Sequence, residues 1–402
     1  MRVLWNLYVI NCFMIRFLYC ILFVVFFCSC NDKNIVYSYD LQPVDSLLNF
    51  ELDSDTKVPL MIRTCKADRE YLYFQNDSRP ELIIYDIYSG SVVKKNIFEI
   101  DGSNAIKGGF LNGFMMLDCD RIFVSGLADG HIYETDTTGR IKYELVSNNR
   151  QNGYNLLPCF KDNGTMQLID GKLYLPQSLN WQLEGNVIEK SPLLSCVDIS
   201  SGEIMPLPIN FPSQLAENRI VRGTPNSIVS EYKCCYTGRY FVYSFAYMDE
   251  LMVVDPINYT TEYKGGKSLY IDKIQIPSLK NMDDKYIQRK ICESPAYGNI
   301  IYDNENKIYY RIVYVPQEIE KNENMLALLR SGRKQFSIMI YDEHFNIIGE
   351  HLFPSYLYNP RLCFVSNGNL YISINHVKNP DYNDDILSFQ KMQLIKNNVV
   401  KQ

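Results

Sequence analysis

The chain has 402 residues, in which 40 Lys and Arg stand against 46 Asp and Glu, and its formal net charge at pH 7 is −6. This acidic balance argues against a nucleic-acid-binding protein, because such proteins meet the phosphate backbone with clusters of Lys and Arg. The length would allow two domains, but no Ser/Gly/Pro-rich linker divides the chain. We therefore expect one folded domain and no nucleic-acid partner.

The N-terminal segment is predicted to be an export signal. The apolar run from Phe17 to Phe27 follows Arg16 and is too short to span about 30 Å of hydrocarbon, which needs about 20 residues. A positive residue before such a run and small residues after it are typical of a signal peptide. A chain that starts at Met14 would still carry a complete signal. The segment ends in FCSC, which resembles a bacterial lipobox, and this resemblance implies cleavage before Cys30 and lipidation of that residue.

Three other interpretations of the leader stay open. They are plain secretion, an uncleaved N-terminal helix, and a metal site formed by Cys28 and Cys30, although a hydrophobic leader is a poor place for such a site. We predict a lipoprotein signal peptide over residues 1–29, a tether over 30–45 and a folded domain over 46–402, anchored in the cell envelope at the outer membrane. Because the leader holds two arginines and no acid, the remaining chain would carry a net charge of −8.

Eight of the twelve cysteines follow Cys30, namely Cys65, Cys119, Cys159, Cys196, Cys234, Cys235, Cys292 and Cys363. An even number in an exported protein would allow a disulfide framework, yet a chain of this length needs no such cross-links. Cys196 and Cys363 lie in apolar runs typical of strands, where a free Cys behaves as a small buried hydrophobe. Cys234 and Cys235 could form a vicinal disulfide, but neighbouring side chains of a strand point to opposite faces. We expect buried thiols.

One short segment recurs six times after the leader. It is an apolar strand with a central aromatic residue, in most copies directly after turn residues, as in GKLYLP and GNLYIS. The six aromatic residues are Tyr73, Phe123, Tyr174, Phe241, Tyr309 and Tyr371, at spacings of 50, 51, 67, 68 and 62 residues. A tight turn that leads into an apolar strand is typical of a β-hairpin.

A second recurring element follows the first five copies. Each is an apolar strand followed by an Asp whose side chain can open a turn into the next strand, and these residues are Asp86, Asp136, Asp198, Asp255 and Asp342. A proline lies 11 to 16 residues before the aromatic residue in five of the six copies, at Pro59, Pro158, Pro225, Pro295 and Pro360. Proline suits a chain that enters a strand from a loop. Each copy therefore predicts four strands, and six such units indicate a six-bladed β-propeller.

The sixth unit is one strand short, because the chain ends after ILSFQKMQLI. The apolar segment SLLNFELD, from Ser46 to Asp53, lies directly before the first unit and can supply the missing strand. Closing the ring with strands from both ends of the chain removes the open edge that would invite aggregation. We therefore predict an all-β fold, a six-bladed β-propeller of four-stranded blades that is closed by an N-terminal strand.

The predicted blades resemble those of NHL-type and related six-bladed propellers, in the pattern GNLYIS … IMIYD … G. A lipobox-like leader followed by a propeller of this size is similar to uncharacterised lipoproteins of the Bacteroidota, which include a family defined only as a domain of unknown function. The resemblance covers almost all of the mature chain, but its motifs are structural and imply no catalytic residue. The unequal blade lengths depart from regular NHL repeats.

Three long insertions interrupt the regular pattern. Two lie between the aromatic strand and the Asp strand, QSLNWQLEGNVIEK in the third unit and PQEIEKNENMLALLRSGRKQ in the fifth, and the third joins the fourth unit to the fifth over Lys264 to Cys292. In an up-and-down blade these connections emerge on one face. Long loops on a rigid scaffold are typical of a binding face, although drift in tolerant loops would give the same pattern. We expect the ligand site here, with Trp181 as a stacking platform for a sugar or peptide and Arg330 and Arg333 nearby.

Three arginines stand near the start of predicted innermost strands: Arg63, Arg222 and Arg361. Innermost strands line the central channel of a propeller, so these side chains could gather at its mouth and bind a carboxylate or a phosphate. Pairing with the acidic surface is the structural alternative. We predict Trp181, Arg63, Arg222 and Arg361 as ligand-binding residues.

No motif in the chain indicates catalysis. None of the four histidines has a partner at the spacing of a zinc site, and neither a Gly-x-Ser-x-Gly elbow nor a phosphate-binding Gly loop is present. The acidic run from Asp381 to Asp385 could be a calcium loop but lacks the EF-hand spacing, which favours a solvated loop. We predict no catalytic residue, no metal and no cofactor.

Two classes of function remain open. The chain is predicted to be a monomeric lipoprotein that binds a glycan, a peptide or a protein partner through its propeller. The alternative is an exported propeller hydrolase or lyase with a channel-bound metal. Paired carboxylates or a cluster of metal ligands converging on the channel would favour the enzyme.

Overall fold

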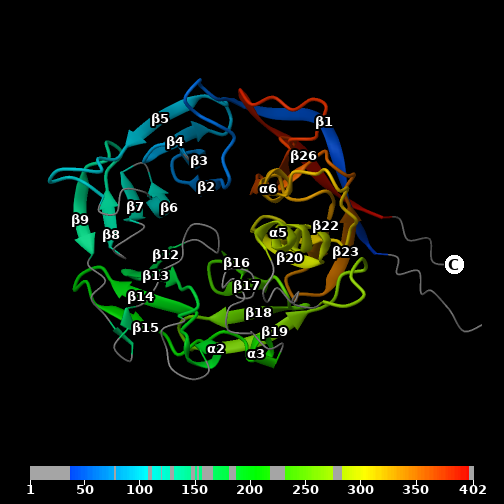
Figure 1. Ribbon diagram of the computed structural model, residues 1–402. Coiled ribbons are helices and arrows are strands. Elements are labelled where there is room, and N and C mark those ends of the chain that lie inside the picture. Colours follow the sequence, from blue (N-terminus) through cyan, green and yellow to red (C-terminus); the bar gives the residue numbers. More distant parts are fainter. Residues whose placement is uncertain are drawn as a thin grey trace, which may run out of the picture. The chain divides into compact units, whose positions relative to one another are not determined.

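The structure of the protein is a computed structural model, and it describes most of the chain from residue 37 to residue 397. The described ranges are 37–76, 78–106, 111–118, 120–126, 131–145, 150–151, 154–155, 166–180, 187–217, 231–274 and 283–397. Within Ser38–Asn398, six four-stranded antiparallel sheets form a ring (Figure 1). The protein is a six-bladed β-propeller, as its sequence predicts.

The blades are numbered in chain order, and their strands are given from the channel outwards (Figure 1). Blade 1 contains β2 (Arg63–Lys66), β3 (Glu70–Asn76), β4 (Glu81–Asp86) and β5 (Val92–Ile97), and blade 2 contains β6 (Leu111–Asp118), β7 (Arg121–Gly126), β8 (Ile132–Thr135) and β9 (Ile141–Leu145). Blade 3 contains β12 (Gln167–Ile169), β13 (Lys172–Pro176), β14 (Leu194–Asp198) and β15 (Ile204–Pro206), and blade 4 contains β16 (Tyr232–Tyr236), β17 (Phe241–Phe245), β18 (Glu250–Asp255) and β19 (Thr260–Gly265). Blade 5 contains β20 (Ala296–Asp303), β21 (Ile308–Tyr314), β22 (Phe336–Tyr341) and β23 (Ile347–Leu352), and blade 6 contains β24 (Asn359–Ser366), β25 (Asn369–Ser373), β26 (Ile386–Lys396) and β1 (Tyr39–Glu51).

A short hairpin and four helices lie outside the blades. The hairpin consists of β10 (Arg150–Gln151) and β11 (Tyr154–Asn155), between blades 2 and 3. The helices are α2 (Val187–Lys190), α3 (Gln214–Glu217), α5 (Asp284–Glu293) and α6 (Met325–Arg330).

The recurring segments of the sequence occupy equivalent places in the blades. Each of the six aromatic residues lies in the second strand of its blade, and each recurring Asp ends or directly follows the third strand. All five of these Asp side chains accept a hydrogen bond from a backbone N–H two or three residues further on, for example from Ser89 to Asp86 at 2.8 Å. Backbone hydrogen bonds within the turns lower the pKa of Asp86 and Asp255. The predicted Asp turns are confirmed.

The hydrophobic core is divided among the six junctions between neighbouring blades, each with its own cluster of buried side chains. All residues of β4 and β22 are buried, because both faces of a blade pack against other blades. At the junction of blades 1 and 2, the rings of Tyr73 and Phe114 meet edge to face with centroids 5.8 Å apart. Continuous apolar runs bounded by turns are expected for strands covered on both sides.

The ring is closed by strands from both ends of the described chain. β1 pairs antiparallel with β26 from Tyr39 opposite Lys396 to Glu51 opposite Ile386, with a register shift after Pro43. The closing strand is therefore confirmed, but it begins at Tyr39, inside the region predicted as a tether. Leu41 anchors the additional part, because its fully buried side chain belongs to the cluster between blades 5 and 6. Proline does not end the strand here, since an outer strand tolerates Pro next to a bulge.

The turn between β4 and β5 touches this closing strand at Gly90. Gly90 has φ +66°, and a Cβ added there would lie 2.6 Å from the backbone oxygen of Asn49. We expect Gly90→Ala to lower the free energy of unfolding by about 2–3 kcal/mol, through left-handed strain and the clash with β1. Urea unfolding measures this loss.

Gly238 provides the matched control for this substitution. It has φ +88°, yet no atom lies within 4 Å of an added Cβ. Gly238→Ala should therefore cost only the backbone strain, about 1 kcal/mol. Equal losses for the two variants would contradict a stabilising contact between Gly90 and the closing strand.

Candidate functional site

All four described helices lie in connections that emerge at the same end of the blade strands. α2 and α6 lie between the second and third strands of blades 3 and 5, whereas α3 and α5 lie in the connections from blade 3 to blade 4 and from blade 4 to blade 5. Because strand direction alternates in an antiparallel blade, these connections emerge at the same end of the strands. We call this end the helix face, and the opposite end, with the short Asp turns, the turn face. The one-sided elaboration expected from the sequence is present.

The helix face is a packed surface near blades 5 and 6. α5 and α6 lie together there (Figure 1), and Cys292 and Leu328 share a buried cluster with Ile319. Arg333, which we expected near the ligand, has a buried side chain that is only 7% exposed. Its Nη1 donates a hydrogen bond to the Ser294 carbonyl at 2.7 Å, and its guanidinium lies 4.3 Å from the ring centroid of Tyr314. The end of α6 is thereby held against the channel wall.

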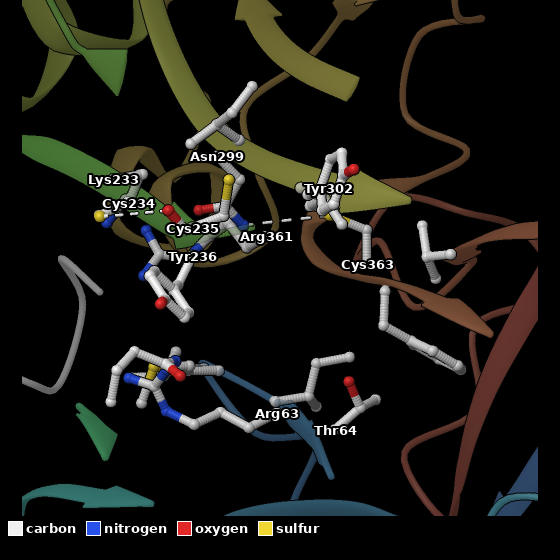
Figure 2. Close-up of a pocket in the computed structure, with 18 of the residues that line it drawn as sticks. Arg63, Thr64, Lys233, Cys234, Cys235, Tyr236, Asn299, Tyr302, Arg361 and Cys363 are labelled. Atoms are coloured by element: carbon white, nitrogen blue, oxygen red, sulfur yellow. Dashed lines mark hydrogen bonds between the residues drawn. The ribbon is translucent and has the colours of Figure 1, made fainter. Parts of the chain in front are cut away.

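A cavity of about 290 Å³ lies among the innermost strands. Its described lining comes from five blades: the innermost strands β2, β12, β16, β20 and β24 with the residues next to them, and Tyr314 at the end of β21. Figure 2 shows Arg63, Lys233 and Arg361 around this space together with Tyr302 and Asn299. The cavity is therefore a feature of the propeller's central channel.

The charged lining residues gather at one end of the cavity. Arg63 is the first residue of β2, Lys233 the second of β16 and Arg361 the third of β24, while Glu231 directly precedes β16. Because every innermost strand starts at the helix face, all four groups lie toward that face. Lys233 Nζ is 3.7 Å from Glu231 Oε1. Among the described lining residues, three cations thus stand against one acid.

The arginine charges act on phenol groups of the neighbouring wall. Burial raises the pKa of Tyr73 to about 12, and the positive charge of Arg63 opposes this rise. Burial likewise raises the pKa of Tyr314, a lining residue, and the charge of Arg361 opposes it. The guanidinium of Arg63 also lies 5.6 Å from the ring centroid of Phe114. Both arginines are half-buried, so their charges are less screened by water than those of surface side chains.

The other end of the cavity is more apolar. Tyr236 is the last residue of β16, and Tyr302 is the last but one of β20, so both lie toward the turn face. Ile301 and Val365 line the same region from β20 and β24. The charged lining residues therefore all lie toward the helix face, whereas the described lining toward the turn face is aromatic and aliphatic. Four apolar or aromatic residues also line the helix-face end, namely Leu60, Met61, Ile62 and Tyr314.

The structure brings two of the predicted ligand-binding residues together. Arg63 and Arg361 line the same cavity, whereas Trp181, Arg222 and the predicted lipid site Cys30 lie outside the described residues. Sequence reasoning missed Lys233, because we interpreted EYKCCY through its cysteine pair. The available signal was its position at the start of a predicted innermost strand, which is the feature that singled out the arginines.

Three thiols also line the cavity, those of Cys234, Cys235 and Cys363. No disulfide joins any two of the six cysteines of the described residues, and four of the six are buried. Cys234 packs toward the cluster between blades 3 and 4 and Cys235 toward the one between blades 4 and 5, so the two side chains point to opposite faces as expected. Burial raises the pKa of Cys235 and of Cys363 to about 12. These thiols are protonated at neutral pH and are poor nucleophiles.

The observations that would favour an enzyme do not occur in the described part of the chain. Glu231 is the one carboxylate among the described lining residues. The described residues hold no group of three or more His, Cys, Asp or Glu that could bind a metal ion. His376 is fully buried. Its Nε2 lies 2.8 Å from the carbonyl oxygen of Arg333, and its Nδ1 accepts a hydrogen bond from the Lys378 N–H, so both ring nitrogens are engaged.

Residues 34–352 match the family described as Domain of unknown function (DUF4221). The chain belongs to this family. The crystal structure of a DUF4221 member from Bacteroides vulgatus is 22% identical, covers 90% of this chain and 100% of its own, and superposes with a TM-score of 0.76. A Bacteroides fragilis structure described as a "putative exported protein" is 12% identical, covers 90% of this chain and 98% of its own, and has a TM-score of 0.52. At these identities both likenesses show the fold alone.

Two further findings bear on this DUF4221 protein. None of the curated proteins matches the chain. Among the described residues, no helix has the length and apolarity needed to cross a membrane.

Proposed function

We propose that this DUF4221 protein is a monomeric binding protein of the cell envelope that takes a ligand into its channel cavity from the helix face. The observation that carries the proposal is the cavity itself, about 290 Å³ in volume and lined by side chains from five blades. Ligand pockets typically have volumes of about 300–1,000 Å³ and combine apolar walls with a few polar groups. This size suits the terminal unit of a glycan or a peptide better than a protein domain.

The chemistry of the lining supports binding over catalysis. Glycoside hydrolysis usually needs two carboxylates that flank the scissile bond, whereas Glu231 is the one acid among the described lining residues. A propeller hydrolase or lyase with a channel-bound metal is the alternative, and no specific observation favours it. The three cations instead supply what an acidic ligand needs for recognition.

The location in the envelope is part of the proposal and rests on the leader, with Cys30 as the lipidated residue at the outer membrane. The fourth strand of a blade runs from the turn face to the helix face, so β1 starts at the turn face with Tyr39. The chain from Cys30 to Tyr39 can span at most about 30 Å. A lipid on Cys30 would therefore hold the start of β1 within about this distance of the membrane.

Membrane attachment is tested by Cys30→Ser in cells that produce the full chain. We expect this variant to lose acyl labelling and to leave the membrane fraction, because the lipidated residue is gone. Cys28→Ser is the matched control and should stay attached. Continued labelling of the Cys30→Ser protein would contradict the lipid anchor.

Ligand binding in the cavity is tested with a glycan and peptide array on the mature protein and on two Trp variants. Thr64 is exposed and lines the cavity, so Thr64→Trp should block it and abolish binding. Thr261 is an exposed residue of the outer strand β19, and Thr261→Trp should leave binding unchanged. Binding that survives Thr64→Trp would place the ligand outside the channel and overturn the proposal.

A further inference from the structure

We propose that the ligand is a compact organic acid whose carboxylate groups meet Arg63, Lys233 and Arg361, with a planar or apolar body below them. This inference rests on the proposed function, because it names the ligand class for the same cavity. Two separate observations carry it: the charges at the helix-face end, and the aromatic and aliphatic lining toward the turn face.

The first observation concerns charge. The three cations come from blades 1, 4 and 6, so they surround the cavity and do not form a stripe along one strand. Among the described lining residues Glu231 is the one carboxylate, in a protein whose overall charge is −6. Half-buried guanidinium groups bind carboxylates through charge-assisted, often bidentate hydrogen bonds. A dianion therefore matches this end of the cavity better than a neutral sugar.

The second observation concerns the body of the ligand. Below the charged end, Tyr236 and Tyr302 offer ring surfaces and Ile301 offers an aliphatic wall. The Tyr302 ring is backed by Tyr309, with centroids 4.7 Å apart, and Tyr236 by Phe241 at 4.8 Å. Side chains supported in this way keep their positions, which lowers the entropy cost of binding a flat or apolar group. A fully hydrated inorganic anion would gain nothing from this region.

Removing the negative charge of Glu231 is expected to strengthen the binding of an acidic ligand, whereas removing one of the cations is expected to weaken it. The Glu231 carboxylate lies 3.7 Å from the Lys233 ammonium at the mouth of the cavity. The negative charge of Glu231 therefore weakens the electrostatic attraction between Lys233 and an incoming anion. Replacing Glu231 by Gln keeps the shape and removes the negative charge. An acidic ligand should then bind more tightly, whereas a cationic ligand should bind more weakly.

The experiment titrates the mature protein by calorimetry with a set of small probes that differ in charge and in body. Isophthalate, benzoate, benzamide and benzylammonium share a ring and carry two, one and no negative charges and one positive charge, respectively. Succinate has two carboxylates without a ring, and inorganic phosphate has neither ring nor carboxylate. We expect isophthalate to bind most tightly, benzoate and succinate more weakly, and phosphate, benzamide and benzylammonium weakest. Added salt should weaken the isophthalate interaction.

Four variants assign the effect to the lining. Arg361→Gln and Lys233→Gln should each weaken isophthalate binding about 10- to 100-fold, as expected for a lost hydrogen bond to a charged group. Glu231→Gln should tighten it. Arg239 lies exposed in the β16–β17 turn on the turn face, so Arg239→Gln is the matched control and should change nothing. Thermal melting of each variant verifies that it is folded.

Several outcomes would overturn the inference. They are benzamide binding as tightly as isophthalate, an unchanged isophthalate titration in Arg361→Gln and Lys233→Gln, phosphate outcompeting every organic acid, or no binding of any anion. The proposed function would survive these results if the array finds a neutral ligand that Thr64→Trp excludes. The failure of the ligand class and the failure of the cavity as a binding site are therefore separate results.

Discussion

Replacing Phe50 by Ala is expected to lower the free energy of unfolding by about 3–5 kcal/mol, as for other fully buried aromatic residues. Phe50 lies on the closing strand β1 and has no exposed surface. Its ring meets Phe389 of blade 6 at 5.9 Å and Tyr85 of blade 1 at 5.3 Å, both edge to face. Loss of the Phe50 side chain leaves a cavity in the cluster between blades 6 and 1, where the two ends of the propeller meet.

The loss is measured by urea unfolding of the mature protein, followed by tyrosine fluorescence and by circular dichroism. Leu47→Ala is the matched control, because Leu47 lies on the same strand but is 50% exposed. This control should cost less than about 1 kcal/mol. If the two variants lose the same stability, β1 contributes through its backbone pairing and the packing of Phe50 has no special role in closure.

The number and order of the blades could be predicted from the sequence, because each blade repeats an aromatic strand and a turn opened by Asp. The sequence could not show whether the recurring aromatic residues occupy the same position within each blade. Tyr73 of blade 1 pairs with Ile84, two residues before Asp86, whereas Phe241 of blade 4 pairs with Val254, one residue before its Asp. A shift of one residue turns a strand side chain to the other face. Tyr73 therefore packs toward blade 2, but Phe241 packs back toward blade 3.

The candidate site could be predicted only in part. Arg63 and Arg361 were recognisable because a propeller's innermost strands line its channel, and both do line the cavity. Arg333 and Arg311 have the same chemistry in the sequence, yet both are buried in the structure. Each of these arginines is held in its buried position by carbonyl groups from segments distant in the chain. No local sequence pattern predicts such hydrogen-bond partners.

Arg311 shows this dependence most clearly. It lies in the apolar run of β21 in blade 5 and has no exposed surface. Its guanidinium group donates hydrogen bonds into blade 4: Nε to Ser244 Oγ at 2.9 Å, Nη2 to the Met248 carbonyl at 2.7 Å and Nη1 to the Asp249 carbonyl. The group also lies 3.6 Å from the ring centroid of Tyr297. One side chain thus satisfies several buried acceptors at the junction of blades 4 and 5.

Replacing Arg311 by Met, which has a similar length but no donors, is expected to cost about 3–5 kcal/mol of the free energy of unfolding. The carbonyl groups and the Ser244 hydroxyl would remain buried without their donor, and each such group costs about 1–3 kcal/mol. Calorimetry and urea unfolding measure the loss. Arg239→Met is the matched control, because Arg239 also stacks on a tyrosine, Tyr240 at 4.7 Å, but is exposed. It should stay within about 0.5 kcal/mol of the parent protein.

The loss in the Arg311→Met protein should also depend on pH, through Glu350. Burial raises the pKa of Glu350 above its ordinary value of 4.5, and the charge of Arg311 counteracts that rise. A carboxyl whose pKa is higher in the folded protein stabilises the fold below its unfolded pKa, and this contribution is lost as the pH rises through the folded value. Without Arg311 the folded pKa rises further, so the difference in stability between variant and parent should grow from pH 4 to pH 7. A difference that is the same at both pH values would mean that Arg311 acts through its hydrogen bonds to blade 4 alone.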